Sequence, residues 1–144
     1  MSVKAIPDGY HTITPYLVVP GAAALIDFLK QAFDARERLR HERPDGAIMH
    51  AEVEIGDSVL MLADAVAAAE ASTATINLYV ADADASYNRA ISAGAESLRE
   101  PADQVFGDRS AGVKDKWGNQ WWLATHIEDV SEEELRRRMS AARA

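Results

Sequence analysis

The chain has 144 residues, the length of one domain, and its 23 acidic and 15 basic residues give a net charge of −8. This acidity, without a basic stripe, argues against nucleic acid and anionic membrane surfaces as partners. No cysteine is present, so disulfides, thiolate metal sites and cysteine nucleophiles are excluded.

The first half of the chain predicts a strand, a helix and then three strands. Residues 12–19 (TITPYLVV) are β-branched and apolar, which is typical of a strand. Residues 21–35 carry apolar side chains at helical spacing. Residues 35–46 predict an exposed strand, and residues 47–64 predict a hairpin that turns at Gly56.

The second half predicts the same order of elements. An alanine-rich linker or short helix leads into a strand at 75–82 and a helix at 83–95 that Gly94 closes. Residues 96–108 predict an irregular strand, and a second hairpin turns around Gly118. The order strand, helix and three strands is therefore repeated.

The two halves can be superposed with an offset of 61 residues, which places Thr14 on Thr75. We therefore predict one domain over 1–144, built from two repeats at about 10–64 and 73–126. A C-terminal helix is expected over about 131–142, where Ser131 and Glu134 match a capping box.

The opening residues, MSVKAIPDGYH, contain no apolar segment that could act as a signal peptide. No apolar run in the chain approaches the length of a transmembrane helix. From these two features we predict a cytoplasmic protein without a membrane partner.

Four segments carry a family resemblance: TPYLVV, HAEVEIGDSVLMLAD, FGDRSAGVKDKWGNQWWLAT and THIEDVSEEEL. They resemble the vicinal oxygen chelate superfamily of glyoxalases, extradiol dioxygenases and bleomycin-resistance proteins, and in particular its PhnB-like, glyoxalase-like branch. The likeness runs from about Tyr10 to Leu135. It implies an α+β fold in which tandem βαβββ units form an incomplete eight-stranded barrel around a central cleft, with helices on the convex face. It also implies a homodimer and a small-molecule ligand.

Trp121 and Trp122 are neighbours on the last predicted strand, so they point to opposite faces of the sheet. Every second residue along the predicted strands belongs to one apolar face, which includes Ile13, Leu17 and Trp121 and is predicted to lie beneath the helices. The other is mixed polar and aromatic, as a ligand cleft should be. The residues assigned to this cleft are Thr14, Tyr16, His50, Glu52, Met61, Thr75, Asn77, Tyr79 and Trp122.

Metal-dependent members of the family place a ligand on the first and last strand of each half, typically His, Gln or Glu. The resemblance puts Thr14, Met61, Thr75 and Trp122 at these positions. None is a good ligand, because a hydroxyl binds weakly, a thioether is soft and an indole only donates. We therefore expect no metal or other cofactor. The alternative is a divalent metal held by other residues, such as those on the strand face of His50 and Glu52.

Two functions follow as hypotheses. The first is a metal-free binding protein of the bleomycin-resistance type, with a ligand in an aromatic-lined cleft. Its negative charge would favour a cationic ligand. The second is a metal-dependent glyoxalase-like lyase, isomerase or dioxygenase with atypical ligands. The sequence leaves open whether the protein is an enzyme.

Several side chains on the predicted cleft face could transfer protons in a closed site. They include Tyr16, Tyr79 and His50, together with Glu52 and Glu54, whose neighbouring carboxylates would raise each other's pKa. His11 and His126 flank predicted strands and are expected to be surface residues. Asp108 and Arg109 are expected to form a structural ion pair that pins the loop before the last hairpin; the alternative is that Arg109 places its guanidinium at the cleft mouth for an anionic group.

Overall fold

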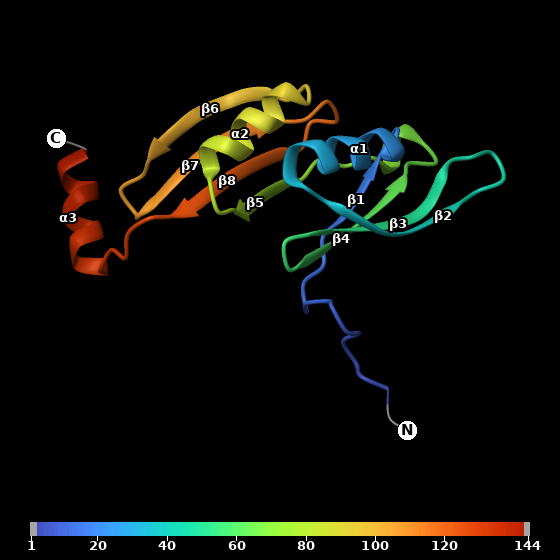
Figure 1. Cartoon of the computed structure of the whole chain (residues 1–144), viewed down its shortest axis with the longest axis horizontal. Helices are drawn as coiled ribbons and strands as arrows, with labels where there is room; N and C mark the ends of the chain where they lie inside the picture. Colours follow the sequence, from blue (N-terminus) through green and yellow to red (C-terminus); the bar gives the residue numbers. More distant parts are fainter. Residues whose placement is uncertain (1–2, 143–144) are drawn as a thin grey trace. The chain divides into compact units, whose positions relative to one another are not determined.

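The computed structural model of the chain describes residues 3–142. It consists of two compact units, Met1–Ala74 and Thr75–Ala144. Each unit contains one four-stranded sheet with an α-helix on it, in the order βαβββ (Figure 1). The predicted α+β fold of tandem βαβββ units is therefore confirmed. Within residues 3–142, strand pairing runs inside each sheet and does not close the eight strands into a barrel.

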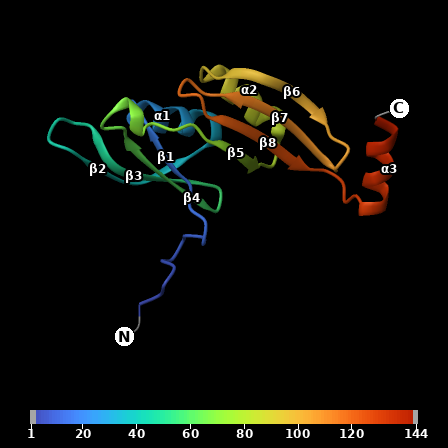
Figure 2. The same ribbon diagram turned by 180° about the vertical axis from the view of Figure 1, so that it is seen from behind.

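The first unit has the strand order β1-β4-β3-β2. Strand β1 is parallel to β4, and β4 pairs antiparallel with β3. Helix α1 lies along one face of this sheet and buries its apolar side against it (Figures 1 and 2). The elements are β1 (Tyr16–Val19), α1 (Ala22–Phe33), β2 (Arg36–Glu42), β3 (Ile48–Ile55), β4 (Ser58–Asp64) and the short 3-10 helix η1 (Ala68–Glu70).

The carboxylate at the end of β4 fastens the start of α1 to the sheet. Asp64 accepts the backbone N–H groups of Gly21 at 2.9 Å and Ala22 at 2.8 Å, and that of Ile48 at 2.7 Å. Burial raises the pKa of Asp64, but these hydrogen bonds outweigh it and leave the pKa below its ordinary value. Gly21 has a φ of 82°, a conformation that favours glycine, where the chain turns into the helix.

The second unit has the strand order β5-β8-β7-β6, and α2 lies on its sheet. Thr125 stands 61 residues after Asp64 and takes the corresponding role. Its hydroxyl accepts the N–H of Ala83 at 2.8 Å and donates to the carbonyl of Val80 at 2.9 Å. The elements are β5 (Thr75–Tyr79), α2 (Ala83–Ser92), β6 (Glu96–Asp103), β7 (Asp108–Lys114), β8 (Gln120–His126) and α3 (Glu132–Ala142).

The first strand is shorter than the sequence predicts. It begins at Tyr16, and only a bond from the Met61 N–H to the Pro15 carbonyl, at 2.9 Å, continues the pairing before it. Ile13 is 84% exposed, so its predicted place beneath a helix is wrong. The alternation of faces requires an extended, paired strand, and residue 13 precedes it. Leu17, inside the strand, is buried as predicted.

Helix α3 begins as its capping pattern predicts, although only one half of the capping box forms. The Ser131 hydroxyl accepts the N–H of Glu134 at 3.1 Å. The Glu134 carboxylate pairs instead with Arg137 at 2.6 Å and Arg138 at 3.1 Å, and these contacts lower its pKa to about 2. Among the helices of residues 3–142, none has the length and apolar character needed to cross a membrane.

Candidate functional site

The two adjacent tryptophans lie on opposite faces of β8, as predicted. Trp121 is fully buried, and its indole N–H donates to the buried carboxylate of Asp115 at 2.9 Å. The same carboxylate accepts the backbone N–H groups of Trp117 and Asn119, both at 2.9 Å, and so fixes the turn before β8. Trp122 is only half-buried. Trp121 therefore belongs to the core, and Trp122 belongs to the open face of the second sheet.

The open face of the first sheet brings together several residues of the predicted cleft. Tyr16 on β1 lies opposite Met61 on β4, and Met61 lies opposite Glu52 on β3. Directly paired residues share a face of the sheet. His50 lies two residues before Glu52 and therefore lies on the same face. Four predicted site residues thus meet on one surface.

A chain of hydrogen bonds connects this surface to residues 3–15, which precede β1 and are called the lead segment below. The Tyr10 hydroxyl donates to Glu52 Oε1, and His50 Nε2 lies 2.8 Å from Glu52 Oε2. His50 Nδ1 lies 2.9 Å from the Tyr16 hydroxyl. Glu52 is only 4% exposed, so both carboxylate oxygens are paired in a nearly dry environment. Sequence reasoning missed Tyr10, because the lead segment has no periodicity from which its side chains could be assigned to a face of the sheet.

The pKa of Glu52 and the partners of Glu54 differ from the prediction. Burial raises the pKa of Glu52, but the hydrogen bonds from Tyr10 and His50 outweigh it and hold the pKa below its ordinary value. The predicted mutual rise with Glu54 is therefore wrong for Glu52. Glu54 is instead paired with arginines of β2, at 2.8 Å to Arg36 and 3.4 Å to Arg38.

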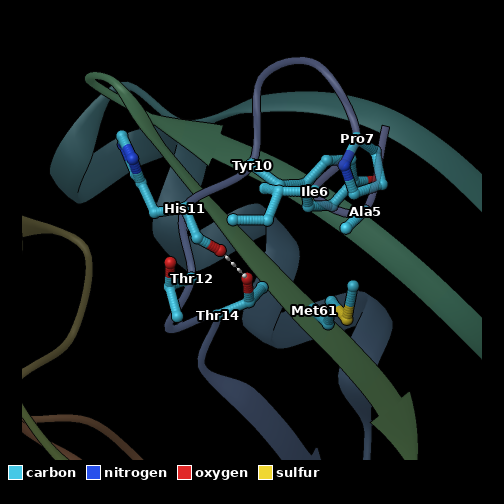
Figure 3. Close-up of a pocket in the computed structure, with 8 residues that line it drawn as sticks. All are labelled: Ala5, Ile6, Pro7, Tyr10, His11, Thr12, Thr14 and Met61. Carbon is cyan, nitrogen blue, oxygen red and sulfur yellow. Dashed lines mark hydrogen bonds between the residues drawn. The ribbon is translucent and has the colours of Figure 1, made fainter. Parts of the chain in front are cut away.

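A pocket of about 370 Å³ lies between the lead segment and the first sheet. Figure 3 shows the lead segment on one side of it and Met61 of β4 on the other. Thr14, a predicted cleft residue, lines the pocket, and its hydroxyl donates to the His11 carbonyl at 3.2 Å. His11 also lines it, so this histidine is more than a strand-flanking residue. The lining residues are Ala5, Ile6, Pro7, Tyr10, His11, Thr12, Thr14 and Met61.

The open face of the second sheet is organised around Trp122. A row of paired residues crosses four strands: Asn77 on β5, Trp122 on β8, Gly112 on β7 and Arg99 on β6. The indole occupies the space of the missing side chain, because a Cβ built on Gly112 would lie 2.4 Å from its Cζ3. The Arg99 guanidinium lies over the ring at 4.9 Å from its centre.

Two further predicted cleft residues lie on the second sheet. Thr75 is exposed opposite Gln120 at the start of β5 and β8. Tyr79 is exposed at the other end of β5, and its hydroxyl donates to Asp108 at 3.2 Å. That hydrogen bond raises the pKa of Tyr79.

His126 is the last residue of β8, and its ring binds two carboxylates. Its Nδ1 lies 2.8 Å from the buried Asp108, and its Nε2 lies 2.7 Å from Asp129. Asp129 and then Asp108 raise the pKa of His126 above its ordinary value.

Arg109 and Asp108 do not pair with each other as expected. Arg109 binds Asp84 of α2 at 2.7 and 3.0 Å and Asp103 of β6 at 3.0 Å, whereas Asp108 binds His126 and Tyr79. The two neighbours therefore hold different parts of the second unit together.

The residues at the four metal-ligand positions implied by the family resemblance do not fit a metal ion. At Thr14 the hydroxyl bonds to a carbonyl, and at Trp122 the indole N–H donates to Gln120 Oε1 at 3.3 Å. Met61 offers a thioether and Thr75 a hydroxyl, which are poor ligands for hard divalent ions. Over residues 3–142, no three His, Asp or Glu side chains converge as a metal site would require.

Residues 9–123 match the model of the glyoxalase/bleomycin resistance protein/dioxygenase superfamily. The chain belongs to this superfamily. An uncharacterized protein of Mycobacterium bovis is 36% identical over 140 residues, covering 90% of this chain and 92% of the relative. Among solved structures with a similar fold, TioX from Micromonospora sp. ML1 has a TM-score of 0.67 at 24% identity, covering 81% of this chain and 99% of TioX. The fosfomycin resistance protein FosX from Mesorhizobium loti has a TM-score of 0.59 at 22% identity, covering 80% and 90%.

Proposed function

We propose that this superfamily member binds a small molecule without a metal ion, on the open face of its first sheet. The observation that carries the proposal is the pairing of Glu52 and His50. Both oxygens of Glu52 and both ring nitrogens of His50 are occupied by hydrogen bonds within the first unit. A metal at His50 would have to displace one of these hydrogen bonds, because each ring nitrogen offers only one lone pair or one N–H.

The pocket of about 370 Å³ beside Met61 supports a small-molecule ligand, because its volume lies in the range of ligand sites. Its wall combines apolar side chains with the hydroxyls of Thr12 and Thr14. Such a lining suits a ligand with an apolar body and a few polar groups. The predicted cleft residues Tyr16, His50 and Glu52 would form the polar floor next to this pocket.

Three finer assignments belong to the same proposal. The protein would be a member of the PhnB-like branch, which its GDS-containing and GDR-containing segments support. It would act as a homodimer, as the family resemblance implies. It would function in the cytoplasm. Disulfides are rare in that reducing compartment, and a chain without cysteine does not need them.

A second candidate is an enzyme of the glyoxalase type. The chain Tyr10–Glu52–His50–Tyr16 favours it, since a buried carboxylate bonded to an imidazole is an arrangement that moves protons. As a lyase, isomerase or dioxygenase, it would recruit a divalent metal through ligands outside the four expected positions. The two candidates differ in whether the ligand still binds after metal is removed.

The test uses protein labelled with ¹³C at its methionine methyl groups and a library of small molecules, screened by NMR in excess EDTA. Met61 lines the pocket, whereas Met49 is exposed on β3 and provides an internal control. The proposal predicts compounds that shift the Met61 methyl and leave the Met49 methyl unchanged. Compounds that bind only after a divalent metal is restored would support the enzyme and contradict the metal-free protein. A library without any compound that shifts Met61 would contradict both.

A further inference from the structure

We propose that the open face of the second sheet binds an anionic group, a carboxylate, phosphate or phosphonate, through Arg99 held over Trp122. The inference goes beyond the proposed binding at the first sheet and assigns the charge of the group that the second sheet binds. It replaces the cationic ligand that the net charge of −8 leads one to expect.

The row across the second sheet explains why Arg99 takes this position. Gly112 separates Arg99 from Trp122 in the strand pairing and has no side chain to stand between them. The indole lies in the space above Gly112, and the guanidinium covers the ring at 4.9 Å. The position that a ligand cation would take over the indole is therefore filled by a cation of the protein itself.

The contact with the indole leaves hydrogen-bonding groups of the guanidinium available. Arginine has five N–H donors, and a cation–π contact with a ring does not use them all. One nitrogen of Arg99 donates to the buried hydroxyl of Ser110, which orients the group. Across residues 3–142, no ion pair joins Arg99 to a carboxylate, whereas Arg109 and Arg138 each bind two carboxylates.

The neighbouring groups on this face also suit an anion. Lys114 is exposed opposite Gln120, next to Trp122 along β8, and the amide of Asn77 lies on the far side of the indole in the same row. Glu96 lies opposite Lys114 in the strand pairing and brings one carboxylate to this part of the face. A planar guanidinium binds the two oxygens of a carboxylate or phosphate together, so Arg99 would be the main contact.

The experiment compares two aromatic probes of similar size and opposite charge, phenylphosphonate and benzylammonium, added to the full-length protein. Binding is followed by the ¹H–¹⁵N signal of the Trp122 indole, and inorganic phosphate is added as a competitor. We expect phenylphosphonate to shift this signal and benzylammonium to leave it in place. Competition by phosphate would identify a free inorganic anion as an equivalent ligand, and its absence would assign the site to an anionic group on a larger molecule.

The variant Arg99→Gln removes the charge, and we expect it to weaken phenylphosphonate binding at least about tenfold. Arg136→Gln, an exposed change of the same charge on α3, is the matched control and should bind as the wild type does. Unaltered binding in Arg99→Gln, or a preference for benzylammonium, would overturn the inference. If the Met61 methyl still responds to small molecules in that case, the proposed function survives and only the assigned charge is wrong.

Discussion

The hydroxyl of Tyr10 donates a hydrogen bond to the buried carboxylate of Glu52, 42 residues further along the chain. This bond fastens the segment before β1 to β3, one of the two inner strands of the first sheet. The Arg38 guanidinium lies over the Tyr10 ring at 4.9 Å, so the phenol is held at both its face and its hydroxyl. The pocket beside Met61 depends on this attachment, because the same segment forms most of its lining.

Replacing Tyr10 with Phe should release the lead segment while keeping the ring. A hydrogen bond to a charged group contributes about 1.5–3 kcal/mol, so we expect a loss of stability toward the low end of that range. Amide hydrogen exchange should quicken over residues 5–14 and stay unchanged in α2. Tyr16→Phe, which removes a hydroxyl from the other end of the network, is the control and should leave exchange in the lead segment as it is. Equal exchange in Tyr10→Phe and wild type would show that the bond does not hold the segment.

The lowered pKa of Glu52 makes stability depend on pH. Because the folded pKa lies below the ordinary value of 4.5, this carboxylate stabilises the fold above pH 4.5 and loses that contribution as the pH falls through the folded pKa. Urea unfolding of wild type and Glu52→Gln across this window should show a difference that shrinks at the acid end. A difference that is constant with pH would mean that Glu52 has the same pKa in the folded and unfolded states.

His126 should titrate above its ordinary value of 6.5, because Asp129 and Asp108 hold its protonated form. A raised folded pKa stabilises the protein below pH 6.5, and the effect is lost as the pH rises through the folded value. An NMR titration of the ring protons tests this. Asp129→Asn should lower the His126 pKa most, Asp108→Asn should lower it less, and Asp45→Asn, on the first unit, should leave it unchanged. An unaltered titration in both of the first two variants would remove the assigned cause.

The order of the elements could be predicted from the sequence because it depends on local signals. The alternation of β3 and β4, the apolar stripe of α1 and the glycine that closes α2 each mark one element without reference to distant residues. The same alternation placed Trp121 in the core and Trp122 on the open face. The alternation gave the wrong face for Ile13. Isoleucine favours strands, but this residue precedes β1 and is exposed.

The partners of the site residues could not be predicted in the same way. Periodicity assigned His50 and Glu52 to one face, but the bond from Tyr10 joins an irregular segment to that face, and no repeat in the sequence predicts it. Arg99 escaped prediction for a related reason. A register shift in β6 between Ser97 and Arg99 breaks the alternation, so counting residues gives the wrong face for Arg99.

The two tryptophans should differ sharply when each is truncated. Trp121→Ala removes a fully buried ring and should cost about 3–5 kcal/mol of unfolding free energy. Trp122→Ala removes a half-buried ring with one cation–π contact and should cost about 1–2 kcal/mol. Denaturant unfolding, with midpoints and slopes compared, measures both values. Equal costs would contradict the assignment of the two rings to opposite faces.

The central claim, that this superfamily member works without a metal, is tested most directly by its metal content. Protein purified without chelator would be measured by inductively coupled plasma mass spectrometry against its concentration. Because Glu52 and His50 bond to each other, and Thr14 and Met61 are poor ligands, we predict far less than one Zn, Ni, Mn or Fe per chain. One equivalent of any of these metals, lost in Glu52→Gln or His50→Ala, would contradict the account and favour the metal-dependent enzyme.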